Sequence, residues 1–146
     1  MKLIFPCDYI GITQGYKSSH KAIDMGWSTG NGGPNHKILA PYDGVVTYVK
    51  NSIRTRNTSS KTYGNYIKIN HGNGVVTLVA HLKYDSIRVK VGDKVKTGDI
   101  LGIMGNTGYS FGVHCHYEVI INGTKVNPLK YTYLSLIHIS EPTRPY

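Results

Sequence analysis

Hydrophobic positions in this chain fall in short runs, most of which alternate with polar residues and end at a tight turn. The residues in these runs are mainly β-branched or aromatic, a composition that favours strands over helices. Turns such as Asp43-Gly44, Gly72-Asn73-Gly74 and Asn122-Gly123 separate the runs. The pattern predicts an all-β domain whose clearest strands cover residues 45–49, 63–71, 75–82 and 112–119.

Weaker elements surround these strands. Residues 3–12 are an apolar entry that predicts an edge strand interrupted by Pro6, and residues 24–27 predict a further strand. The polar composition of residues 28–35 and 50–61 predicts two loops, the second of them a long basic loop that closes a hairpin.

The strand at residues 112–119 carries the first candidate chemistry. Residues two apart on a strand point the same way, so His114 and His116 share one face and Cys115 points to the other. Two neighbouring imidazoles can begin a zinc site, but the same spacing also fits two hydrogen-bonded histidines on a half-buried strand. We expect Cys115 to be a small buried filler rather than a ligand or nucleophile.

A second signal is an imidazole and a carboxylate four residues apart, at His20 and Asp24. Together with one histidine of the later strand they would make three protein ligands. Three ligands leave a fourth position for water, which is the catalytic rather than the structural arrangement of zinc. The other histidine of the pair would be free to transfer protons. The metal histidines are not part of an H-E-x-x-H pattern, which excludes a helix-based zinc protease.

These motifs, together with Ala80-His81-Leu82 and the stretch at residues 105–116, closely resemble the lysostaphin-type (LytM-type) zinc endopeptidases, which cut the peptide part of bacterial peptidoglycan. The resemblance covers about residues 6–134. It implies antiparallel sheets around a narrow groove, with a duplicated hybrid motif. It also implies that His20, Asp24 and His116 bind one Zn²⁺ per chain and that His81 and His114 are the catalytic pair. From spacing alone, His81 would be a core histidine.

Two other histidines carry weaker signals. His36 follows a polar loop, so we expect it to be exposed and without a metal role. His71 ends a predicted strand beside a turn, and we expect a structural role for it.

Composition sets limits on partners. The 146 residues fit one domain, and the net charge of +9 draws the chain to polyanions. Peptidoglycan and anionic cell-wall polymers are the expected partners, and Arg54 and Arg56 concentrate charge for wall binding, although a merely solvated basic loop fits as well. The basic residues do not form a helix or an aromatic-interleaved strip, so we do not expect nucleic-acid binding. No apolar run is long enough for a membrane span.

The ends of the chain raise separate expectations. Pro6 interrupts the N-terminus before a signal peptide can form, so delivery to the wall would need phage lysis machinery or incorporation into a virion. The chain is thus expected to be a phage-encoded lysin made in the host cytoplasm, either a monomer or part of a larger lysis or virion assembly. Otherwise we expect it to be extracellular. Residues 1–134 would form the peptidase domain, and residues 135–146 a non-native or disordered tail. Cys7 and Cys115 are too few for a disulfide framework, although a bridge between them stays open.

Two other functions remain to be weighed. One is a non-catalytic wall-binding or regulatory module on the same fold, but such relatives lack part of the metal set and this chain has all five positions. The other is a nucleic-acid-binding β-barrel, which only the positive charge supports.

Overall fold

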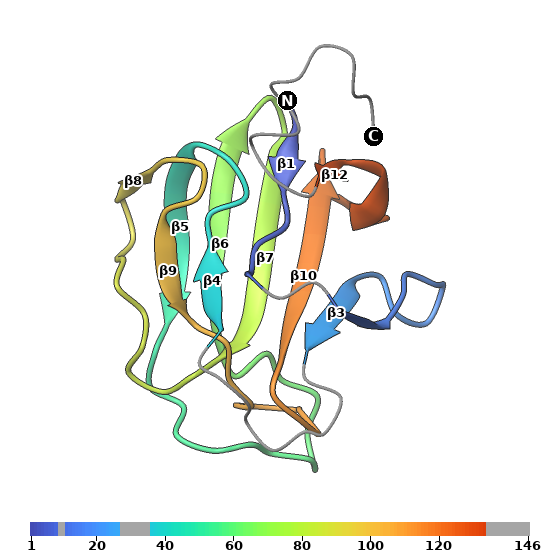
Figure 1. Ribbon diagram of the computed structural model, residues 1–146, viewed down its shortest axis with the longest axis vertical. Coiled ribbons are helices and arrows are strands. Elements are labelled where there is room, and N and C mark those ends of the chain that lie inside the picture. The colour runs from blue at the N-terminus through green and yellow to red at the C-terminus, as the bar shows by residue number, and fades with distance from the viewer. Residues whose placement is uncertain (9–10, 27–35, 134–146) are drawn as a thin grey trace.

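The computed structural model describes residues 1–8, 11–26 and 36–133 of the chain (Figure 1). The expected loop at residues 28–35 and the expected tail at residues 135–146 lie outside these ranges, as does Trp27 at the end of a predicted strand. Within the described residues, no helix is long and apolar enough to cross a membrane.

One large antiparallel sheet forms the body of the molecule. Its strands, in spatial order, are β2 (Ile12–Gln14), β3 (Ile23–Gly26), β10 (His114–Ile121), β7 (Val75–Leu82), β6 (Asn65–Gly72), β5 (Gly44–Lys50) and β8 (Lys94–Val95). A further strand, β11 (Thr124–Val126), pairs with the second half of β10. The predicted all-β class is confirmed, since the only helical element of the described residues is the 3₁₀ turn η1 (Pro128–Lys130).

Two small sheets pack on one face of the large sheet (Figure 1). One is the antiparallel pair of β4 (Lys37–Leu39) and β9 (Ile100–Ile103). The other is the pair of β1 (Leu3–Ile4) and β12 (Thr132–Tyr133), which run parallel and join the two ends of the described chain. The expected edge strand at residues 3–12 is therefore divided into β1 and β2, which belong to different sheets.

The core lies between the large sheet and these two pairs. It is built from the inward side chains of β3, β5, β6, β7, β8 and β10 together with apolar residues of the small sheets and of the N-terminal segment. Tyr117 is the largest fully buried side chain among the described residues. Its hydroxyl group forms a hydrogen bond with Thr132 Oγ1 at 2.9 Å, so it is not left unpaired in the core.

Strand β10 connects the core to the opposite face of the sheet. Cys115, Tyr117 and Val119 are fully buried on the core side. His114 and His116 alternate with them and lie on the other face. The predicted assignment of faces for the H-x-H motif and for Cys115 agrees with this arrangement.

A close backbone contact fixes the loop that precedes β6. Gly64 has φ +64°, and a Cβ atom there would lie 2.4 Å from the carbonyl oxygen of Thr107. Gly72, at the other end of β6, has φ +87° but has no atom within 4 Å of the position of a Cβ. Both positions strain an L-residue, but only Gly64 also lacks the space for one.

We therefore expect Gly64→Ala to lower the free energy of unfolding more than Gly72→Ala does. Backbone strain alone costs about 1–2 kcal/mol, and this sets the expected loss for Gly72→Ala. Gly64→Ala adds a steric overlap that must displace Thr107. Urea denaturation of the chelator-treated protein measures both losses, and equal losses would contradict the role given to the close contact.

Candidate functional site

A cleft of about 840 Å³ opens on the face of the large sheet opposite the core. Its floor contains His20, Asp24, His81, His114 and His116, which are all five residues singled out from the sequence and its resemblance. Its walls come from Thr13 and Gln14 of β2 and from two loops, which contribute residues 61–63 and residues 109–113.

Three of these side chains form a compact cluster. One ligand atom each from His20, Asp24 and His116 can be chosen so that all lie within 4.8 Å of one another. His20 Nε2 is 3.2 Å from Asp24 Oδ2, and His116 Nδ1 is 3.0 Å from Asp24 Oδ1. Asp24 and His116 are direct partners in the antiparallel pairing of β3 with β10. Two imidazoles and one carboxylate in this arrangement match the donor types that zinc takes.

The other two histidines lie beside this cluster. The ring centroids of His81 and His114 are 4.7 Å apart, and His81 is 5.7 Å from the ring of His116. His114 Nε2 is 3.8 Å from Asp24 Oδ1. Two imidazoles that are not needed as ligands therefore border the space next to the His–Asp–His cluster, where they could transfer protons.

His81 reaches this place by a departure from regular strand geometry. Simple alternation would put it on the core side with Val79. Instead, its backbone has φ +65°, which is rare for a residue with a side chain, and the pairing of β6 with β7 is irregular at this end. The His81 N–H donates to the carbonyl oxygen of Tyr63 at 2.9 Å. The left-handed conformation thus turns the ring out of the core and into the cleft.

A buried polar network supports this conformation. Thr107 accepts a hydrogen bond from the Asn65 N–H at 3.1 Å and donates to the carbonyl oxygen of Leu82 at 2.8 Å. The Asn65 side chain donates to the same Leu82 oxygen at 3.2 Å, and also bonds the backbone of Ile53 in both directions. Asn65 is completely buried with its amide paired, so it fixes the backbone that follows His81.

Every histidine of the cleft uses one ring nitrogen as a donor to a neighbouring oxygen. Because a carbonyl oxygen can only accept, the nitrogen that faces it carries the hydrogen. The four bonds are His20 Nδ1–H to Gly15 O at 3.1 Å, His81 Nδ1–H to Thr107 O at 2.6 Å, His114 Nδ1–H to Gly112 O at 2.8 Å and His116 Nε2–H to Glu118 Oε2 at 2.9 Å. The opposite nitrogens of His81 and His114 are left to accept a proton. Those of His20 and His116 face Asp24, at 3.2 and 3.0 Å, where a metal ion could bind.

The charges of the rings follow from their surroundings. Burial lowers the pKa of His81 to about 3, with a further contribution from nearby His114, and burial also lowers the pKa of His114. Burial alone would lower the pKa of His116 too, but its hydrogen bonds to Asp24 and Glu118 outweigh this and raise the pKa to about 9. Burial opposes ionisation of Asp24, yet the His116 hydrogen bond and the other nearby histidines hold its pKa below the usual value.

Sequence reasoning missed the residues that orient these rings. Glu118 lies two residues beyond His116 on the same strand face, so the alternation that paired the histidines could have included it. Thr107 and Asn65 act through long-range contacts that no local pattern reveals. Arg54, expected to be exposed, is exposed and lies over the ring of Tyr84 with its guanidinium carbon 4.3 Å from the centroid.

The remaining histidines and the cysteines lie outside the cleft. The expectation that His36 is exposed is wrong, because it is half-buried and its Nδ1 is 2.8 Å from Asp8 Oδ1. His71 is structural as expected, with Nδ1 bonded to the carbonyl oxygen of Asp43 and Nε2 to Thr77 Oγ1. Cys115 is buried, and its side chain hydrogen-bonds with Cys7, both cysteines being thiols rather than a disulfide.

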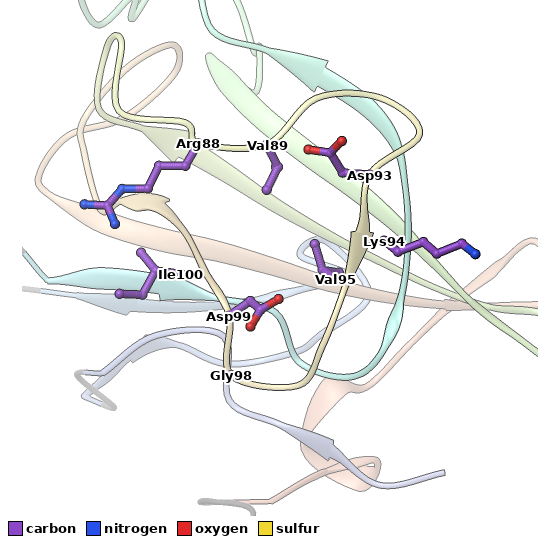
Figure 2. Close-up of a pocket in the computed structure, with 8 residues that line it drawn as sticks. All are labelled: Arg88, Val89, Asp93, Lys94, Val95, Gly98, Asp99 and Ile100. Atoms are coloured by element: carbon purple, nitrogen blue, oxygen red, sulfur yellow. The ribbon is translucent and has the colours of Figure 1, made fainter.

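A second hollow lies near the turns that flank β8 (Figure 2). The charged ends of Arg88 and Lys94 point away from each other across it. Its carboxylates already accept backbone hydrogen bonds, Asp93 from Lys90 and Asp99 from Lys96. The polar groups of this hollow do not converge on a common point, in contrast to those of the cleft.

The fold and the cleft together define a chain of the metallopeptidase type. The model of peptidase family M23 matches residues 18–128, which is most of the chain, and the chain belongs to this family. The resemblance to lysostaphin-type enzymes is confirmed at the level of the family.

Curated proteins with similar sequences come from several bacteria. An uncharacterized metalloprotease of Buchnera aphidicola is 42% identical over 111 residues, which are 76% of this chain and 26% of that protein. The peptidoglycan DD-endopeptidase ShyA of Vibrio cholerae is 44% identical over 88 residues, 60% of this chain and 18% of ShyA. The murein hydrolase activator NlpD of Escherichia coli is 34% identical over 115 residues, 79% of this chain and 26% of NlpD. The chain thus spans about a quarter or less of these relatives.

Solved structures share the fold. A zinc-containing peptidase from Vibrio cholerae superimposes with a TM-score of 0.73 at 26% identity, covering 92% of this chain and 41% of that one. The catalytic domain of the prophage-encoded M23 protein EnpA from Enterococcus faecalis gives a TM-score of 0.61 at 31% identity, with coverage of 85% and 87%. Lysostaphin from Staphylococcus simulans gives 0.63 at 25% identity, with coverage of 84% and 48%.

The pKa shifts predict how the rings titrate in metal-free protein. A raised pKa keeps His116 protonated to higher pH, so between pH 6.5 and about 9 it should be charged while His81 and His114 are neutral. Two-dimensional ¹H–¹⁵N NMR of the chelator-treated protein distinguishes these states for each ring. A neutral His116 at pH 7.5 would contradict the arrangement of carboxylates around it.

Proposed function

We propose that this chain is a zinc-dependent endopeptidase that hydrolyses peptide cross-links or stem peptides of bacterial peptidoglycan. The observation that carries the proposal is the convergence of His20, Asp24 and His116, with the His81–His114 pair beside them, in one cleft. Family membership supports a peptidase, and the similarity to a peptidoglycan DD-endopeptidase supports the substrate.

The cluster fits a zinc ion by donor type and by orientation. His20 would present Nε2, Asp24 a carboxylate oxygen and His116 Nδ1, because the other nitrogen of each ring is already a donor to Gly15 or Glu118. Three protein ligands with a free fourth position form the arrangement used for catalysis. Asp24 supplies the only negative charge among the three ligands, so a bound ion would keep most of its charge.

Zinc bound there would act as a Lewis acid that polarises the scissile carbonyl and lowers the pKa of water. The chain's own part in the reaction is proton transfer and orientation. His81 and His114 are held neutral with Nδ1 as donor, so each can accept a proton at Nε2. One ring takes the proton of the attacking water, and the resulting imidazolium can stabilise the oxyanion and protonate the leaving amine.

Delivery and wider partners are part of the same proposal. The similarity to a prophage-encoded M23 domain supports a phage-encoded lysin that is made in the host cytoplasm and acts on the wall during lysis or from a virion. The net charge of +9 supports additional attraction to anionic cell-wall polymers.

Three variants of purified protein test the division of labour. Asp24→Ala should lose both zinc and cleavage of isolated peptidoglycan, because it removes a ligand. His114→Ala should keep about one zinc per chain and lose roughly 10²–10⁴-fold in cleavage rate, as expected for loss of a proton-transfer group. His36→Gln is a control outside the cleft and should change neither. Zinc is measured by elemental analysis and products by mass spectrometry.

Three outcomes would refute parts of the proposal. Undiminished cleavage by His114→Ala would remove the assigned role of the histidine pair. Cleavage that survives complete metal removal would exclude a role for the metal. Asp24→Ala protein that cleaves as fast as the unmodified chain would exclude it as well.

A non-catalytic regulatory module is the second candidate, because NlpD is described as a murein hydrolase activator. The two candidates differ in what the chain does alone. A peptidase releases peptide fragments from purified walls without help, whereas an activator only increases the lysis produced by another hydrolase. Retention of all five cleft residues favours the peptidase.

A further inference from the structure

Glu118 is a buried acid that the proposed reaction does not use. It is 2% exposed and lies on β10, on the same face as His116. One of its oxygens, Oε2, receives three hydrogen bonds, from His116 Nε2 at 2.9 Å, Tyr63 Oη at 2.7 Å and Lys125 Nζ at 3.3 Å. The other oxygen, Oε1, is buried and has no hydrogen-bond partner among the described residues.

Burying a carboxylate with one oxygen unpaired is costly, and side chains selected only for stability avoid it. Three donors nevertheless converge on its other oxygen, so the carboxyl group is held at a place where an apolar side chain would fill the space without burying a polar group. The arrangement points to a function that needs the carboxylate.

The bond to His116 has a specific consequence for the ring. It places a hydrogen on Nε2, so when the ring is neutral, as a metal ligand must be, its lone pair lies on Nδ1, the nitrogen that is 3.0 Å from Asp24 Oδ1. Without this acceptor, the neutral ring could carry its hydrogen on Nδ1 and present no lone pair to the cluster. A carboxylate on the far nitrogen also increases the basicity of the near one.

We propose that Glu118 is a positioning residue that fixes the tautomer and orientation of His116 for metal binding, with Tyr63 and Lys125 holding its carboxylate in place. The inference rests on the proposed zinc site. Tyr63 lines the cleft, but its hydroxyl hydrogen is directed at Glu118, and its oxygen lies 3.4 Å from Lys125 Nζ. Tyr63 therefore joins the wall of the cleft to the support of the metal ligand.

Zinc binding to the full chain tests the proposal without measuring cleavage. Competition with a chromophoric chelator gives the zinc affinity of the unmodified chain, Glu118→Leu and Glu118→Gln. We expect Glu118→Leu to bind zinc about 10–100-fold more weakly, the range known for partners that hydrogen-bond metal-bound histidines. Glu118→Gln keeps an oxygen acceptor and loses the charge, so its loss should be smaller but measurable.

A matched control removes a hydrogen bond from a different histidine of the same sheet. Thr77→Val takes away the partner of His71 Nε2, which is buried on the core side, and should leave zinc affinity unchanged. NMR of the zinc-loaded proteins adds a readout that loss of stability alone would not alter. His116 should show a slowly exchanging Nε2–H in the unmodified chain and in Thr77→Val, and should lose it in Glu118→Leu.

The outcomes separate the two proposals. If the unmodified chain fails to bind zinc, the proposed function fails. If the unmodified chain binds zinc and both Glu118 variants bind it equally well, the role of Glu118 is overturned and the proposed function stands. Should Glu118→Leu not fold, Glu118→Gln decides alone, and an affinity equal to that of the unmodified chain overturns the inference.

Discussion

The antiparallel pairing of β3 with β10 is the constraint on which the cleft depends. It sets Asp24 directly opposite His116, and Gly26 opposite His114. Side chains on a strand alternate, so a slip of one residue would bring Cys115 opposite Asp24 and turn the histidines toward the core. The buried side chains of Cys115, Tyr117 and Val119 oppose such a slip, because each would have to leave the core. The apolar residues on one face of β10 thereby fix the position of the histidines on its other face.

Around this pairing, the orientation of each ring depends on an oxygen acceptor outside the cluster. Three acceptors are backbone carbonyls, at Gly15, Thr107 and Gly112, and the fourth is the carboxylate of Glu118. Backbone carbonyls are held by the fold, so the orientation of His20, His81 and His114 does not depend on a side-chain acceptor. The left-handed backbone at His81 belongs to the same scheme, since the buried network around Thr107 holds both the turn and the acceptor.

The sequence predicted much of this structure because its signals are local. Alternation identified the hairpin of β6 and β7 and placed His114 and His116 on one face with Cys115 on the other. Local signals could not place His81, because alternation points it into the core and only the resemblance to a family brought it into the cleft. The exposure of His36 was misjudged because its partner, Asp8, is 28 residues away in the chain. Glu118 was overlooked although the same alternation places it on the face of His116. The role of a single carboxylate depends on its contacts, and the sequence does not show them.

The central claim is that the pairing of β3 with β10 brings the metal-binding residues together and that these hydrogen bonds determine which ring nitrogen of each histidine is available. A crystal structure of the zinc-loaded chain, with the ion located by its anomalous scattering, tests this most directly. The account predicts a single ion at about 2.0–2.2 Å from His20 Nε2, one oxygen of Asp24 and His116 Nδ1, with His81 and His114 not coordinated. An ion bound by His81 or His114, or by Nε2 of His116, would contradict it.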